Sequence, residues 1–279
     1  MKLTIRYAGL TDRGRVRPAN EDNWAADSDQ GLFIVADGMG GEFGGTLASK
    51  AVVETLPILV RQEFGMMPNL PKRRAGRRMA KAIATLSTQM RQQTQNEPGL
   101  EGMGATVVCA LVRSNQVLVA HMGDSRAYRL RAGQLWQHTK DHSLIGLLLA
   151  SGDITPEEAA THPARGRLTR NVGMEGEPLP QTRLLKLKPG DVFLLCTDGL
   201  SGMLGDLQIA SILNEPAPLE ARCQRLIDAA NQAGGKDNIT VVLLAVEAGE
   251  KKPDSNARHA ESVRVPCSKA MHGKAVGQV

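Results

Sequence analysis

The chain has 279 residues, of which 42% are apolar, 23% are charged and only 3% are aromatic. These proportions exclude collagen-like, mucin-like and wholly disordered chains, and the length allows one or two domains. The formal net charge is +5, but residues 72–78 carry +5 and residues 249–279 carry +3, so the remainder carries −3. Because this remainder is acidic and poor in aromatic side chains, we expect no nucleic-acid partner.

Cysteine usage and the amino terminus indicate the compartment. Cys109, Cys196, Cys223 and Cys267 form no C-x-x-C pair, and their wide spacing is not typical of a disulfide framework. We therefore expect reduced, mostly buried thiols. The first residues lack the apolar block of a secretory signal, and no apolar run approaches the roughly 18 residues of a membrane span. The sequence predicts a cytoplasmic protein without a membrane span.

The first third of the chain contains two predicted strands and two predicted helices. Strand-like runs occur at 3–8 and 32–36, and helical spacing of apolar residues occurs at 46–64 and 72–96. Pro57 lies inside the first helix and predicts a break or a kink there.

The middle of the chain is rich in predicted strands. Ser114-Asn115 and Ala132-Gly133 are turn-like pairs, and each predicts a hairpin. The strands that these turns join lie at 105–112 and 116–122, and at 127–130 and 134–137.

Residues 142–170 form a less regular, helix-prone insertion. Within it, Thr155 is a good N-cap for a helix that begins at Pro156. The remaining predicted elements are strands at 181–187, 192–196 and 239–246 and helices at 207–213 and 219–230.

The carboxyl-terminal segment differs from the rest in composition. Residues 249–279 are polar, charged and poor in branched apolar side chains, which predicts a disordered basic tail. Recurring hairpins favour an α+β fold over strict β-α alternation. We expect one domain at 1–248 that contains a flap at about 142–170, followed by the tail.

Four aspartates stand at the ends of predicted strands. Asp37 and Asp198 each follow an apolar strand and precede a glycine. Asp237 precedes the last strand, and Asp124 follows the strand at 116–122. Strand ends hold side chains rigidly, and Mg²⁺ and Mn²⁺ prefer carboxylate and water oxygens. A single Asp-Gly pair is usually a turn, but the four together indicate a divalent-cation site.

An acidic pair near the amino terminus extends this set. Glu21 and Asp22 follow Arg17. An isolated arginine before an acidic pair is usually part of a weak surface ion pair. Beside a cation site, the planar guanidinium of Arg17 could instead hold two phosphate oxygens. The residues alone leave both interpretations open.

Taken together, these segments resemble a known family. Five motifs lie in the family's order and are similar to those of the bacterial metal-dependent protein phosphatases of type 2C. Each motif alone is weak evidence, whereas five in order are specific. Residues 139–143 and 156–158 also resemble the family's flap. The motifs are Arg17-Pro18-Ala19-Asn20-Glu21-Asp22, Val35-Ala36-Asp37-Gly38-Met39-Gly40-Gly41, Gly123-Asp124-Ser125-Arg126, Cys196-Thr197-Asp198-Gly199-Leu200 and Lys236-Asp237-Asn238-Ile239-Thr240.

The resemblance implies a fold and a metal centre. The fold would be a four-layer α-β-β-α sandwich, with two central, mainly antiparallel sheets flanked by helix pairs. Asp37 would bridge two Mn²⁺ or Mg²⁺ ions, and the carbonyl of Gly38 would help to hold one of them. Asp198 and Asp237 would bind the other ion.

The same resemblance gives roles to the remaining acidic residues. Asp124, together with Asp198, is a candidate for a third and weaker metal site. Glu21 is assigned to the metal site and Asp22 to the catalytic residues, and both would act on metal-bound waters more than as direct ligands.

The implied activity is that of a protein serine/threonine phosphatase. Uncatalysed hydrolysis of phosphate monoesters is extremely slow, and two cations about 3.5–4 Å apart can activate a bridging water. A metal-bridging hydroxide would attack phosphorus while Arg17 clamps the phosphoryl group, without a covalent intermediate. The implied partners are proteins phosphorylated on serine or threonine and a bacterial kinase that the enzyme opposes, and we expect a monomer.

One position departs from the pattern of the eukaryotic relatives. They carry a histidine directly after the Asp-Gly pair, where it is a candidate general acid, whereas this chain has Met39. Methionine cannot donate a proton, so we expect a metal-bound water to do so.

Three alternatives compete with the phosphatase. The glycines at 38–45 superficially resemble a phosphate-binding loop, but no complete nucleotide-binding motif is present. A catalytically weak regulatory or binding module with the same fold is disfavoured because every metal carboxylate is retained. Asp141, His142 and Ser143 suggest a nucleophilic triad, but adjacent residues rarely have the required geometry.

Overall fold

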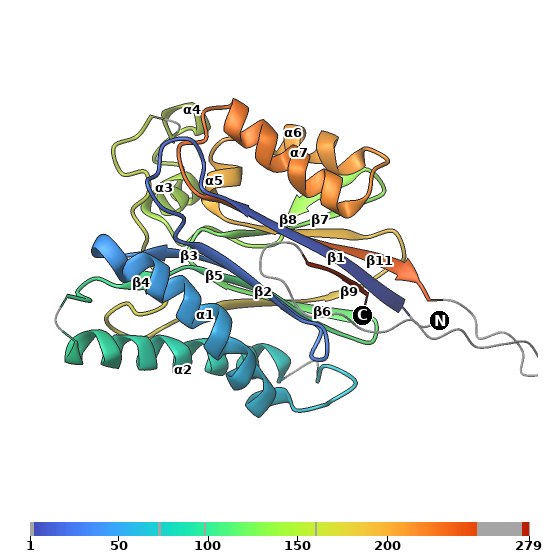
Figure 1. Ribbon diagram of the computed structural model, residues 1–279, viewed down its shortest axis with the longest axis horizontal. Helices are drawn as coiled ribbons and strands as arrows, with labels where there is room; N and C mark the ends of the chain where they lie inside the picture. The colour runs from blue at the N-terminus through green and yellow to red at the C-terminus, as the bar shows by residue number, and fades with distance from the viewer. Residues whose placement is uncertain (1–2, 72–73, 98, 160, 250–274, 279) are drawn as a thin grey trace, which may run out of the picture.

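The protein is built on two antiparallel sheets that lie face to face (Figure 1). The computed structural model describes residues 3–71, 74–97, 99–159, 161–249 and 275–278. The first sheet has the strand order β12 (Ala275–Gln278), β1 (Leu3–Asp12), β11 (Ile239–Ala248), β10 (Val192–Cys196), β7 (Arg126–Arg131) and β8 (Gln134–Gln137). The second sheet has the order β2 (Asp22–Asp27), β3 (Leu32–Met39), β5 (Val107–Arg113), β6 (Gln116–Met122) and β9 (Gln181–Lys186), with β4 (Gly104–Ala105) paired to β3.

Helix pairs cover the outer faces of both sheets, which gives four layers (Figure 1). α1 (Gly41–Phe64) and α2 (Ala75–Asn96) cover the second sheet, and α6 (Asp206–Asn214) and α7 (Leu219–Gln232) cover the first. The predicted α-β-β-α sandwich is thereby confirmed. Within the described ranges, no helix is long and apolar enough to cross a bilayer.

Alternation along the strands divides the apolar core into layers. On β3, Phe33 points between the two sheets, whereas Ile34 points towards α1 and α2. On β10, Phe193 points between the sheets and Leu194 faces the other helix pair. Because successive side chains of a strand point to opposite faces, this packing also fixes the direction of the polar residues at the strand ends.

Both predicted hairpins are confirmed. β5 and β6 are joined at Ser114-Asn115, and β7 and β8 are joined at Ala132-Gly133. Ser114 and Ala132 have φ values of 51° and 49°, in the left-handed region that a tight two-residue turn requires at its first position.

The first helix differs from its prediction at two points. α1 begins at Gly41, so the glycine-rich segment after Asp37 forms the end of β3 and the first helical turn rather than a loop. The helix also continues through Pro57, so of the predicted break or kink, the break is absent. Leu56 and Val60 are fully buried beside this proline, and their packing on the second sheet outweighs the loss of one helical hydrogen bond.

The predicted disordered tail needs correction at its end. Residues 250–274 lie outside the described residues, but β12 pairs with β1 from Arg6 to Gly9. β1 would otherwise be an edge strand, and its unpaired backbone groups can accept another strand.

The flap contains two short helices, α3 (Leu144–Ser151) and α4 (Pro156–Ala159). Ser143 Oγ accepts a hydrogen bond from the backbone of α3 and so acts as its N-cap. Thr155 Oγ1 accepts from the backbone N–H of Glu158 at 3.2 Å, and the Glu158 carboxylate accepts from Thr155 N–H at 2.8 Å. The predicted cap at Thr155 is confirmed.

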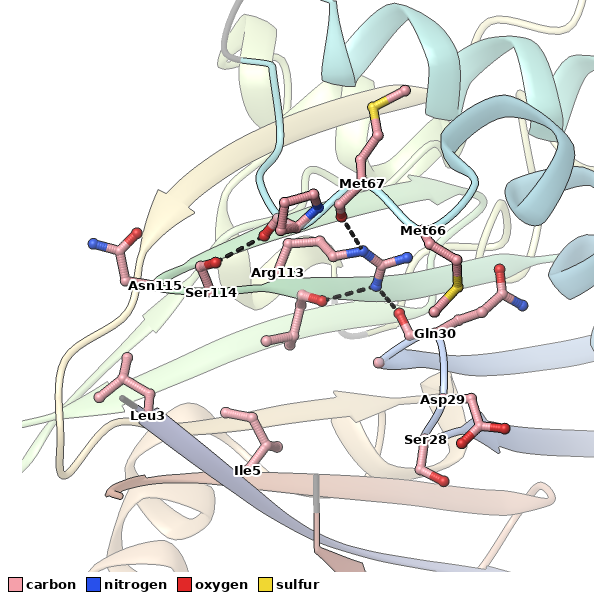
Figure 2. Close-up of a pocket in the computed structure, with 13 residues that line it drawn as sticks. Leu3, Ile5, Ser28, Asp29, Gln30, Met66, Met67, Arg113, Ser114 and Asn115 are labelled. Carbon is pink, nitrogen blue, oxygen red and sulfur yellow. Dashed lines mark hydrogen bonds between the residues drawn. The ribbon is translucent and has the colours of Figure 1, made fainter. Parts of the chain in front are cut away.

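Arg113 lies in a hollow of about 540 Å³ near the start of β3, at the far end of this strand from Asp37 (Figure 2). Its guanidinium donates to the carbonyl oxygens of Met67 and Val112, both at 3.0 Å, and to that of Gln30. One half-buried cation therefore satisfies carbonyl groups from three separate segments, as Figure 2 shows.

We expect Arg113→Met to lower the free energy of unfolding by about 2 kcal/mol, because these carbonyl groups lose a charged donor while the apolar stem is largely kept. Arg77→Met, at an exposed position of α2, should change it by less than about 0.5 kcal/mol. Urea unfolding measures both. Equal stability of the two variants would contradict this role of Arg113.

Candidate active site

Carboxylates of the second sheet meet where β2 begins and β3 ends. Asp22 is the first residue of β2 and is the register partner of Asp37. The backbone N–H of Gly38 donates to the Glu21 carbonyl at 3.2 Å, which continues the pairing beyond Asp22. The antiparallel register therefore places the two aspartates side by side.

The first sheet contributes two more aspartates at neighbouring strand ends. Asp198 follows β10 and begins α5 (Asp198–Ser201), and Asp237 lies just before β11, the neighbour of β10. The backbone N–H of Thr197 donates to the Thr240 carbonyl at 3.1 Å. Strand pairing thus continues up to the two aspartates.

A threonine hydroxyl joins the two sheets at this point. Thr197 Oγ1 donates to Asp22 Oδ2 at 2.9 Å and accepts from the backbone N–H of Thr240 at 3.0 Å. All three residues are buried. The sequence does not identify Thr197 as a functional residue, because this contact joins distant parts of the chain. Its only signal is its place before Asp198 in a motif.

Asp124 reaches the same region through Thr106. Thr106 Oγ1 accepts from the backbone N–H of Asp37 at 3.0 Å and shares a 2.7 Å hydrogen bond with Ser125 Oγ. The turn that carries Asp124 is thereby tied to the end of β3. Asp124 lies close enough to Asp37 and Asp198 for their charges to interact.

Burial and mutual repulsion raise the pKa of these carboxyl groups. Burial, followed by the charges of Asp22 and Asp198, raises the pKa of Asp37 well above its usual value. Burial is also the main cause that raises the pKa of Asp22 to about 8, although hydrogen bonds from threonines oppose it. Burial and the charge of Asp198 raise the pKa of Asp124 to about 7. Bringing these carboxylates together in ionised form therefore requires a source of positive charge.

Oxygen atoms without partners fit a divalent cation. Among the described residues, Asp22 Oδ1 and Asp198 Oδ1 are buried and accept no hydrogen bond. A Cβ atom on Gly45 would lie 2.3 Å from Glu21 Oε1 and 2.9 Å from the Gly38 carbonyl oxygen, so only glycine at this position lets both oxygens pack so closely against the start of α1. Carboxylate and carbonyl oxygens are the donors that Mg²⁺ and Mn²⁺ prefer.

The arrangement of the carboxylates is open rather than cage-like. In the part of the chain that the structure describes, no three His, Cys, Asp or Glu side chains are gathered as ligands of one ion. Mg²⁺ usually keeps several waters and takes only one or two carboxylates from the protein. Asp37 and Asp198, which lie within hydrogen-bonding distance of each other, suit ions bound in this way.

Arg17 lies at the mouth of the cluster. Its Nη2 donates to Asp237 Oδ2 at 2.7 Å, and 48% of its side chain is exposed. The hydrogen bond to Asp237 raises the pKa of Arg17, and the charges of Asp37 and Asp198 add to this effect. Arg17 is therefore a cation held beside the carboxylates and open to solvent, the position that a phosphate-binding role requires.

Asn238 fixes the loop that carries Arg17 and Glu21. Its side-chain amide donates to the carbonyls of Arg13 and Ala19, both at 2.8 Å, and its Oδ1 accepts from Glu21 N–H at 2.8 Å. The sequence places Asn238 in a motif but gives it no role. The structure identifies it as the residue that attaches this loop to β11.

A groove of about 560 Å³ opens beside the cluster. Its charged lining includes Asp124, Asp198 and Arg126. Ile145 and Leu149 of α3 and Pro156 of α4 line it from the flap. The groove therefore combines charged side chains with apolar ones.

The alternative triad does not form. His142 Nδ1 accepts from the backbone N–H of Gly123 at 3.2 Å, and Asp141 binds Arg126 through both carboxylate oxygens. Ser143 instead caps α3. The three side chains have separate structural partners.

Comparison with known proteins gives concordant results. The sequence pattern of the family described as "Protein phosphatase 2C" matches residues 15–243. The chain is 36% identical over 257 residues to the serine/threonine phosphatase stp of Listeria monocytogenes serotype 4b, covering 88% of this chain and 98% of that protein.

Solved structures agree with the sequence matches. The crystal structure of the Mycobacterium tuberculosis serine/threonine phosphatase PstP/Ppp is 39% identical, with a TM-score of 0.77, and the match covers 88% of this chain and all of that one. The catalytic domain of PstP in complex with two manganese ions is 36% identical over the same shares, with a TM-score of 0.75. This chain therefore belongs to the protein phosphatase 2C family and is a protein serine/threonine phosphatase, a phosphoric monoester hydrolase.

Proposed function

We propose that this phosphatase uses two Mn²⁺ or Mg²⁺ ions held between the two sheets. The unpartnered oxygens of Asp22 and Asp198 carry the proposal, because buried carboxylate oxygens without donors are otherwise unfavourable. Asp37 and the Gly38 carbonyl would hold one ion, and Asp198 and Asp237 would hold the other. The PstP domain with two manganese ions supports this assignment.

Asp124 and Glu21 would complete the metal site. Asp124 lies beside Asp198 and is the candidate ligand of a third, weaker ion. Glu21 Oε1 packs against Gly45 and would accept hydrogen bonds from coordinated water. Asp22, oriented by Thr197, would do the same from the other side.

The residues of this chain then act on the phosphate group. When bound, the cations would neutralise charge on the phosphoryl oxygens and activate water for attack on phosphorus. Arg17 would orient the phosphoryl group through its guanidinium, and Asp237 holds that guanidinium in place.

Cysteine chemistry does not compete with this route in the described part of the chain. Cys109, Cys196 and Cys223 are buried, and burial raises the pKa of each thiol to about 12. A thiol with such a pKa is a poor nucleophile at neutral pH. Cys267 lies outside the described residues.

The physiological substrates would be proteins phosphorylated on serine or threonine by a bacterial kinase that this enzyme opposes. The groove beside Asp124 has room for residues next to the phosphorylated one, and its apolar flap side would contact them. We propose a cytoplasmic location, which suits three buried cysteines that form no disulfide.

Asp37→Asn should reduce hydrolysis of an aryl phosphate with Mn²⁺ to near the uncatalysed rate, because a ligand of the proposed metal site is lost. Mn²⁺ affinity by calorimetry should fall by about 100-fold or more. Asp29→Asn, in the exposed turn at the other end of the same hairpin, is the matched control and should retain activity. Activity of Asp37→Asn that survives a chelator would overturn the metal mechanism.

Arg17→Lys should lower kcat/KM by about tenfold or more, because a lysine cannot bind two oxygens as the planar guanidinium does. Steady-state kinetics with an aryl phosphate and a phosphopeptide measure the effect. Arg15→Lys, an exposed neighbour in the same loop, should leave both constants unchanged. Equal kinetics of the two variants would exclude the assigned role of Arg17.

Without metal, the protein should lose stability as the pH rises from about 4 to about 8, because the carboxyl groups of Asp22, Asp37 and Asp124 hold protons more tightly in the folded than in the unfolded chain. Urea unfolding in a chelator measures this. Asp22→Asn should weaken the dependence of the free energy of unfolding on pH, and near pH 8 this variant should be more stable than the wild type. Asp29→Asn should follow the wild type at every pH. If the stability of the wild type does not fall relative to that of Asp22→Asn as the pH rises, the proposed repulsion between the carboxylates is contradicted.

A further inference from the structure

A second polar pocket lies between the edge strands of the two sheets. It has a volume of about 400 Å³ and is lined by β6, by Gln137 at the end of β8 with the following residues 138–140, and by β9. β8 ends the first sheet and β9 ends the second. The pocket therefore occupies the open edge of the layer between the sheets.

Alternation along the strands directs three arginines into this edge. Ala127 on β7 points between the sheets, so Arg129 and Arg131, two and four residues later, point the same way. Leu185 on β9 packs in the same layer, and so Arg183 also points into it. The layer is apolar at its centre and becomes basic at this edge.

Little negative charge compensates these cations within the described residues. Arg131 binds Asp191 through Nε at 2.5 Å and Nη2 at 2.6 Å. Arg129 Nε is buried without a hydrogen-bond partner, and its guanidinium lies 5.4 Å from the ring centre of Trp136. No carboxylate of the described chain forms an ion pair with Arg129 or Arg183.

His138 lies within the same group of cations. Neither of its ring nitrogens has a hydrogen-bond partner in the described part of the molecule. Burial, followed by the charges of Arg129 and Arg183, lowers the pKa of His138 to about 4. Lys140 adds a further basic side chain on the pocket wall. Like charges held together in this way repel one another unless an anion lies between them.

We propose that this pocket is a second anion site that binds an oxyanion of the phosphate class. Arg183 and Lys140 line it and are exposed, and Arg129, whose Nε is buried without a partner, adds positive charge from β7. Guanidinium groups bind phosphate oxygens in pairs, and a dianion would neutralise most of the uncompensated charge. The source is either free phosphate, which is the product of the reaction, or a phosphorylated side chain of a protein.

The pocket is separate from the carboxylate cluster. His121 lines it and stacks on His142, with ring centres 4.6 Å apart, and both histidines are buried. His142 in turn accepts from the backbone of Gly123, next to Asp124. The histidine pair thus forms a wall between the two sites.

Histidine-ring NMR of the Mg²⁺-loaded full chain tests the proposal. Inorganic phosphate should shift the His138 signals, and Arg183→Gln should weaken this binding by about tenfold or more. Lys186→Gln removes the same charge from the same strand, but its side chain points to the opposite face, and it should bind as the wild type does. Unmoved His138 signals with every probe, or equal binding by both variants, would overturn the proposal.

Two peptides distinguish the sources. One carries a non-hydrolysable phosphonate analogue of phosphoserine, and the other carries serine at that position. If only the phosphonate peptide shifts the His138 signals, and Arg183→Gln removes that shift, the ligand is a phosphorylated protein. If inorganic phosphate alone suffices, the ligand is free phosphate. An equal shift by the serine peptide would show that the pocket does not recognise phosphate and would overturn the proposal.

Discussion

The main constraint on this structure is that its two sheets hold mutually repelling carboxylates close together. Asp22 and Asp37 come from one sheet, Asp198 and Asp237 from the other, and burial strengthens their mutual repulsion. Flexible loops would move apart under such a force, whereas paired strands cannot do so without losing their hydrogen bonds. The Thr197 hydroxyl donates a hydrogen bond to Asp22 across the interface, and so it fixes the position of one sheet relative to the other at this point. The sandwich therefore keeps these repelling carboxylates together, and the proposed cations would offset their repulsion.

Local signals explain which parts of the fold could be predicted from sequence. The turns at Ser114 and Ala132 are set by neighbouring residues, and the hairpins were predictable for that reason. β2 and α5 were not, because β2 is only half-buried after Asp22 and α5 is a single turn. Asp37 and Asp198 were identifiable from their motifs. The contact of Thr197 with Asp22 was not, because it depends on how one sheet lies on the other.

The glycine-rich segment shows why composition alone can mislead. Gly38 to Gly45 has the glycines of a phosphate-binding loop, yet it forms the end of β3 and the first turn of α1. A Cβ atom on Gly38 would lie 1.9 Å from the Gly45 carbonyl oxygen, so the glycines serve close backbone packing. That packing brings the start of α1 against the Glu21 carbonyl, to which Ser49 Oγ donates at 2.5 Å.

Charge is distributed unevenly, and this distribution bears on how a phosphorylated protein approaches. The ionised carboxylate cluster repels a phosphate dianion, so binding of the proposed cations would favour phosphate binding through electrostatics. Arg17 is the one cation of the described chain that is paired with an aspartate of this cluster. The arginines at the β8–β9 edge have no such acidic neighbours apart from Asp191. An anion is therefore attracted to that edge whether or not metal is bound, and the two regions should differ in the way their phosphate affinity responds to metal.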